Sequence, residues 1–150
     1  MSEIKSLASI LLDPTQINQV AQACVSLIES EVSSKKGLKG MGIKAGFAAV
    51  KRWKPNVISQ LVLTLLPEFV DAIEPFYQEF IKSGQADFKQ YLMGQKDRVI
   101  MGLLSVTDLR ASKSKHKILV STYKKLRPLA EAQVAAAMPK LTSVLNSFGL

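Results

Sequence analysis

Hydrophobic residues recur every three or four positions along most of this chain, which is the spacing of amphipathic α-helices. The longest such stripe covers more than 20 residues and stops at Ser83-Gly84. Its members are Ile58, Leu61, Val62, Leu65, Phe69, Ile73, Phe76, Tyr77 and Phe80. Similar patterns precede and follow this stripe. The sequence therefore predicts a single all-α domain over residues 1–150, folded as a compact bundle of about six to eight helices.

Several of the predicted helices are bounded by prolines. A first helix is expected from roughly Ser2 to Leu12. Asp13 then has the features of an N-cap, with Pro14 at the first helical position, so a second helix is predicted to open there. A third helix is expected from about Lys39 to Trp53. It ends before Pro55, because the residue preceding a proline avoids helical angles.

Four more prolines lie inside helical patterns. Pro67 and Pro75 fall within the longest stripe. Because each removes a backbone donor and clashes with the preceding turn, we expect a kink or a break into two helices near Leu66. Pro128 and Pro139 are expected to interrupt the last helical region in the same way.

One segment, His116 to Tyr123 (HKILVSTY), is rich in β-branched and aromatic residues and has the composition of a strand. A lone strand has no neighbour to satisfy its backbone hydrogen bonds, and no second strand-like run is evident. A helix is therefore favoured for this segment.

Three segments resemble a family of small, all-helical bacterial proteins of unknown function. They are GLKGMGIKAGFAAVKRWKP (37–55), LLPEFVDAIEPFYQEF (65–80) and KLRPLAEAQVAAAMPKL (125–141), which occur in this order. The similarity covers most of the chain. It implies an all-helical domain in a bacterial, cytoplasmic protein, and it brings no catalytic or binding residues with it.

Composition and the length of the apolar segments also indicate where in the cell the protein is located. Apolar residues make up 47% of the chain, too many for a disordered protein. A single cysteine, Cys24, cannot form an internal disulfide. The longest apolar stretch, Val57 to Leu66, is half the length of about 20 residues that a bilayer requires, so no transmembrane segment is expected. No signal peptide is evident either, and the predicted localisation is cytoplasmic.

Positive charge is the strongest indication of a partner. The formal net charge is +8, and the segments 32–67 and 109–130 each carry seven lysines and arginines and no acid. These residues are the candidate anion-binding set: Lys35, Lys36, Lys39, Lys44, Lys51, Arg52, Lys54, Arg110, Lys113, Lys115, Lys117, Lys124, Lys125 and Arg127. Clustered basic charge attracts anions but does not select among nucleic acid, acidic protein and anionic membrane.

The first basic segment also contains glycines with the spacing of a phosphate-binding loop, at Gly37 and Gly42. Ile43 occupies the position of the loop's lysine, and no strand precedes the segment, so this interpretation fails. A helix-joining turn is favoured, followed by a thin face of small residues around Gly46, suited to the bulky stripe over Phe69 to Phe80. A weaker alternative remains, in which the N–H groups at the start of the helix bind an anion among the nearby lysines.

No set of residues has the form of an active site. Cys24 lies on an apolar stripe and is expected to act as a small buried hydrophobe. His116 is the only histidine, and one cysteine with one histidine cannot complete a zinc site. We expect neither catalysis nor a metal or other cofactor, although Cys–His catalysis is not excluded by sequence alone.

Acidic residues cluster once. Glu68, Asp71 and Glu74 are three positions apart and could share a helix face, as metal-binding carboxylates do. Di-iron bundles, however, use Glu-x-x-His motifs, which this chain lacks. A solvated face is favoured, with Glu68 complementing the dipole of a helix that begins at Pro67. A further alternative is that the acid-only segment Glu68 to Glu79 pairs with the basic segments, within the fold or between subunits.

The sequence thus favours a non-enzymatic helical interaction protein that binds an anionic partner through its basic segments. The alternative is a bundle that holds an apolar ligand or a partner helix, or a homo-oligomeric structural protein. Its motivation is that Val57, Leu63, Leu66 and Val70 lie off the main stripe and make this helix apolar nearly all round.

Overall fold

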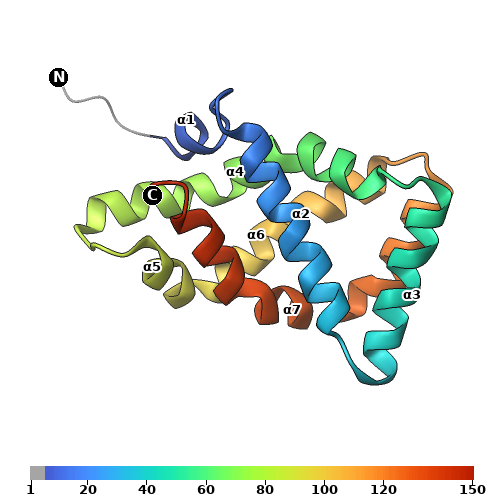
Figure 1. The fold of residues 1–150 in the computed structure, drawn as a ribbon. Helices are drawn as coiled ribbons and strands as arrows, with labels where there is room; N and C mark the ends of the chain where they lie inside the picture. Colours follow the sequence, from blue (N-terminus) through green and yellow to red (C-terminus); the bar gives the residue numbers. More distant parts are fainter. Residues whose placement is uncertain (1–5) are drawn as a thin grey trace.

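Seven α-helices and no strand make up residues 6–150, the part of the chain that the computed structural model describes (Figure 1). They are α1 (Leu7–Leu11), α2 (Ile17–Ser34), α3 (Gly37–Trp53), α4 (Val57–Ser83), α5 (Phe88–Gly94), α6 (Lys96–Lys113) and α7 (Lys117–Asn146). The all-α prediction is confirmed, including the helix over His116 to Tyr123, which opens α7. Hydrophobic periodicity was sufficient for this result because every long helix here buries one face.

Helix α4 is the centre of the bundle, and α1, α2, α5 and α6 pack around it (Figure 1). Its buried face consists of Leu66, Val70, Ile73, Phe76 and Tyr77, which join one continuous core with residues of the other helices. Burial of each such side chain contributes roughly 1.5–3 kcal/mol. The aromatic rings cluster at the end of α4, where it meets α5. Of the predicted stripe, Ile73, Phe76 and Tyr77 are buried. In the first half of α4 the buried residues are instead ones that lie off the stripe, such as Leu66 and Val70, so the stripe predicted the core correctly only in the second half of the helix.

The end of α4 is fixed by Gly84, which has a φ of +73° and stops the helix in a left-handed conformation. The two prolines inside α4 do not break it. The helix runs through Pro67 and Pro75 without interruption, and α7 likewise runs through Pro128 and Pro139. A proline in a helix interior costs about 3 kcal/mol, which is comparable to the free energy gained by burying one or two core side chains.

The N-terminal helix is anchored by a side chain from α4. The Glu74 carboxylate accepts hydrogen bonds from the backbone N–H of Leu7 at 2.9 Å and of Ala8 at 3.3 Å. Leu7 and Leu11 are almost fully buried in the core. A helix of five residues is unstable alone, so these tertiary contacts hold it in place. The helix predicted over 2–12 begins at Leu7, and its residues 2–5 lie outside the described part of the chain.

The second helix begins three residues later than predicted. Helix α2 starts at Ile17, not at Pro14, and its N-cap position is Gln16. Asp13 instead accepts hydrogen bonds from the backbone N–H of Thr15 at 2.8 Å and from its hydroxyl at 2.6 Å. Asp side chains often bond the backbone two residues ahead and so form a turn that competes with a helix start.

Helix α3 lies at the edge of the molecule, and its axis makes an angle of 98° with that of α4 (Figure 1). The connection between α2 and α3 forms a corner of the fold. None of the helices in residues 6–150 is by itself long and apolar enough to cross a membrane.

Candidate anion-binding surface

Helix α3 and the first half of α7 pack side by side in opposite directions. Near the middle of α3, a Cβ atom built on Gly46 would lie 3.2 Å from side-chain carbons of both Thr122 and Leu126. At the end of α3, the ring of Trp53 lies 5.4 Å from that of His116, just before α7. Since α3 carries the first basic segment and α7 the second, these contacts bring the two segments together.

The small-residue face of α3 has a different neighbour from the one the sequence suggested. We expected it to receive the aromatic stripe of α4, but Gly46 faces Leu126 and Thr122 of α7. The absence of a side chain at Gly46 lets these two helices approach closely. The 98° angle between α3 and α4 explains the difference, because crossed helices cannot align their faces over a long distance.

Four of the fourteen candidate cations are bound to acids of the same chain. The pairs are Lys35–Glu31 at 3.2 Å, Lys51–Glu29 at 3.4 Å, Arg110–Glu68 at 2.8 Å and Arg127–Asp108 at 2.8 Å. All four acids lie outside the two acid-free segments. The suggestion that acids of α4 pair with the basic segments thus holds for Glu68 only; Glu79 pairs instead with Arg98, at 3.2 Å.

Arg127 belongs to a polar cluster that joins α6 to α7. Its guanidinium donates two hydrogen bonds to the Asp108 carboxylate, which also accepts one from the Tyr123 hydroxyl. The Thr107 hydroxyl lies 2.7 Å from that of Tyr123. Hydrogen bonds from Arg127 and then from Tyr123 lower the pKa of Asp108. Burial and the bond to Asp108 raise the pKa of Tyr123. These groups hold the fold together and are not free to bind a partner.

The other ten cations are all exposed, and they form no ion pair with any residue in the described range 6–150. They are Lys36, Lys39, Lys44, Arg52, Lys54, Lys113, Lys115, Lys117, Lys124 and Lys125. We call this set the basic surface. It extends over α3, the end of α6 and the start of α7.

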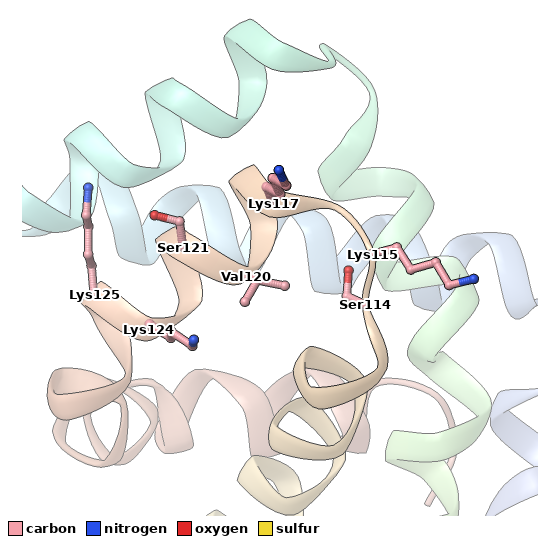
Figure 2. A pocket seen from close by; sticks show the side chains of 7 residues that line it. All are labelled: Ser114, Lys115, Lys117, Val120, Ser121, Lys124 and Lys125. Carbon is pink, nitrogen blue, oxygen red and sulfur yellow. The ribbon is translucent and has the colours of Figure 1, made fainter.

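An open cavity of about 550 Å³ lies within the basic surface, where α6 connects to α7 (Figure 2). Lys115, Lys117, Lys124 and Lys125 line it, with Ser114, Val120 and Ser121. The four ammonium groups point in different directions; Lys125 extends toward α3, whereas Lys115 extends away from it (Figure 2). Groups arranged in this way do not enclose a small ion.

The glycines of α3 have structural roles. Gly37 begins the helix with a φ of +75°. A Cβ atom on Gly40 would lie 2.7 Å from the carbonyl carbon of Lys35, so only glycine fits this tight connection. The helix-joining turn predicted at Gly37 to Gly42 was wrong, because these residues form the first turns of α3, which begins two residues before the predicted start near Lys39. Of the lysines expected around its N–H groups, Lys35 is engaged by Glu31, while Lys36, Lys39 and Lys44 belong to the basic surface.

The remaining candidate groups are also engaged in the fold. Cys24 packs against the core, and burial raises the pKa of its thiol, which disfavours the reactive thiolate. His116 contacts Trp53. In residues 6–150, no three histidines, cysteines or acids are grouped as a metal site requires. The dipole interpretation of Glu68 was wrong, because α4 begins at Val57 and Glu68 lies in its interior.

The apolar surface of α4 is mostly enclosed by the fold itself. Of the four residues that lie off its main stripe, Val57, Leu66 and Val70 are buried, and only Leu63 is exposed, at 44%. A second open cavity, of about 600 Å³, lies between α2 and α7; apolar residues such as Leu27 and Val144 line it, together with serines, Lys89 and Lys140. Neither feature is an enclosed apolar pocket.

Two exposed apolar residues were missed by the sequence analysis. Leu38 is 88% exposed and Met41 is 66% exposed, both near the start of α3. Their spacing with Ala45 and Ala48 places all four on one helix face, opposite the buried Ile43. This periodicity was visible in the sequence, but nothing in it said which face of α3 would be covered.

A family described as a family of unknown function (DUF6918) matches residues 7–148. The chain belongs to this family. The match covers all seven helices, in agreement with the resemblance inferred from the three helical segments. No curated protein and no solved structure matches the chain. Membership in this family does not identify a function. The basic surface is therefore the feature of the molecule that indicates one.

Proposed function

We propose that this protein is a non-enzymatic, cytoplasmic interaction protein that binds an extended anionic partner through the basic surface. The observation that carries the proposal is the packing of α3 against α7, which joins two acid-free segments and leaves ten exposed cations without ion pairs. Like charges held side by side repel one another, and an anionic partner relieves that repulsion. The spread of the lysine side chains favours a polyanion or a charged surface over a small ion.

The alternative, a bundle that holds an apolar ligand, has less support. Three of the four residues that motivated it are buried by the chain's own helices. Homo-oligomerisation through the exposed part of α4 would depend on Leu63 and Ile81, which lie far apart along the helix, and is not needed to explain the remaining surface.

The test is the binding of polyanions at two salt concentrations. Gel shifts with a single-stranded oligonucleotide and sedimentation with anionic vesicles should detect at least one complex at about 50 mM salt. Binding should fall steeply by about 200 mM salt, because displaced counterions drive such association. Failure to bind either polyanion at the lower salt concentration would exclude the proposal.

A matched pair of variants separates the surface from total charge. Lys117→Glu/Lys124→Glu reverses two charges of the basic surface, whereas Lys82→Glu/Lys96→Glu reverses two charges outside it. Both change the net charge equally. Only the first should reduce binding strongly; an equal reduction in both would mean that overall charge, and not this surface, is recognised.

A further inference from the structure

The start of α3 combines exposed apolar side chains with unpaired lysines. Leu38 and Met41 are the two most exposed large hydrophobic residues in the described part of the chain, at 88% and 66%. Both lie on the solvent-facing side of α3, whose other side is buried through Gly40, Ile43 and Val50. None of the seven helices in the described range covers them.

Three cations lie near this apolar tip in the sequence. Lys36, Lys39 and Lys44 are exposed and form no ion pair within residues 6–150. No acid occurs between Val32 and Pro67. The first turn of α3 contains no acidic residue that would complement the helix dipole. Within residues 6–150, neither the exposed apolar side chains nor these lysines therefore have a complement.

The position of this tip in the fold leaves it accessible to a flat surface. Helix α3 lies at the edge of the molecule, nearly perpendicular to α4, and its start forms a corner where the chain arrives from α2 (Figure 1). A corner can touch a membrane without movement of the core. The basic surface continues from it along α3 to α7.

We propose that α3 docks this protein onto an anionic lipid membrane, with Leu38 and Met41 inserted at the level of the headgroups and Lys36, Lys39 and Lys44 among the lipid phosphates. This inference rests on the proposed function and names its partner. A basic helix with one apolar face is the form that lies in the plane of a membrane interface. A nucleic-acid backbone offers a phosphate to each lysine but no apolar environment to an exposed leucine, so the observations favour the membrane.

Sedimentation with vesicles tests this docking directly. The wild-type protein should bind phosphatidylglycerol-containing vesicles and not pure phosphatidylcholine vesicles. Leu38→Ser/Met41→Ser should weaken binding by about tenfold or more, because burying even one such side chain is worth roughly that factor. Met101→Ser is the matched control, since Met101 is 54% exposed on α6, outside the basic surface, and its replacement should leave binding unchanged.

Tryptophan fluorescence tests the insertion of α3 separately from the binding affinity. In a Trp53→Phe background, Leu38→Trp places the only tryptophan at the tip. Its emission should shift to shorter wavelength on addition of phosphatidylglycerol vesicles and be quenched by brominated lipid. Absence of both changes while the protein is vesicle-bound would overturn the insertion of α3.

The outcomes distinguish this inference from the proposed function. Binding of an oligonucleotide without binding of vesicles would overturn the membrane partner and leave the anionic partner standing. Vesicle binding that is unaffected by Leu38→Ser/Met41→Ser would overturn the role of the apolar tip alone. Failure to bind either polyanion would remove both.

Discussion

Asp108 and Arg127 join α6 to α7 through two parallel hydrogen bonds, of 2.8 Å and 3.1 Å, between carboxylate and guanidinium. This two-point geometry fixes the angle at which α7 leaves the end of α6. It thereby sets where the first half of α7, with its lysines, meets α3. The cluster removes one arginine from the basic surface but holds the rest of that surface in place.

The stability contributed by Asp108 should depend on pH. Because hydrogen bonds to Arg127 and Tyr123 lower its pKa in the folded protein, the contribution is present above the unfolded value of about 3.9 and is lost as the pH falls through the folded pKa. Asp108→Asn should therefore lower the urea midpoint at pH 7, and the difference from wild type should shrink below about pH 4. Asp71→Asn, on the exposed side of α4, is the control for removal of a surface carboxylate and should leave the urea midpoint at pH 7 near the wild-type value. A difference that is constant with pH would contradict the role of this carboxylate.

The close approach of α3 and α7 predicts opposite effects of one substitution at two glycines. Gly46→Leu places side-chain atoms against Thr122 and Leu126 and should destabilise the fold by about 1–3 kcal/mol. Gly42→Leu, in the same helix, meets no atom within 4 Å and should stabilise it by about 0.5–1 kcal/mol, as glycine is a poor helix former. Urea denaturation of both variants provides the measurement. Equal effects would show that the two helices do not constrain Gly46.

Removing the Glu74 carboxylate should release α1. Glu74→Ala leaves the N–H groups of Leu7 and Ala8 without their acceptor and should cost about 1 kcal/mol, similar to the loss of a helix cap. Faster hydrogen exchange over residues 7–12 is the expected signature. Glu74→Gln retains an oxygen acceptor and should give an intermediate rate. Unchanged exchange in Glu74→Ala would mean that burial of Leu7 and Leu11 alone holds the helix.

The ring contact between Trp53 and His116 should be visible in fluorescence. His116→Ala removes the ring that lies 5.4 Å from the indole, so emission should shift to longer wavelength and acrylamide quenching should increase. The expected loss of stability is about 0.5–1 kcal/mol. His116→Phe keeps a ring at this position and should leave both signals near their wild-type values. An unchanged spectrum in His116→Ala would argue against the junction of the two basic segments.

Local properties of the chain were readable in advance. The all-α class, the burial of Ile73, Phe76 and Tyr77 in α4 and the end of that helix at Gly84 follow from side-chain spacing and from the backbone preferences of single residues. The helix boundaries that were predicted incorrectly also have local causes. Asp13 accepts a hydrogen bond from Thr15 in a turn where a helix start was expected. An aspartate side chain can either cap a helix or close such a turn, and the sequence does not decide between the two.

The surface, by contrast, depends on residues that are far apart in sequence. Lys51 and Glu29 are 22 positions apart, and Arg110 and Glu68 are 42 apart, so their pairing is decided only when the helices pack. The same packing covers Gly46 with Leu126 and leaves Leu38 bare. The sequence by itself determined which residues are helical and where positive charge is concentrated, since both depend on spacing along the chain. The tertiary structure alone decided which cations remain unpaired and which helix face stays exposed, because neutralisation and burial require contact between different helices.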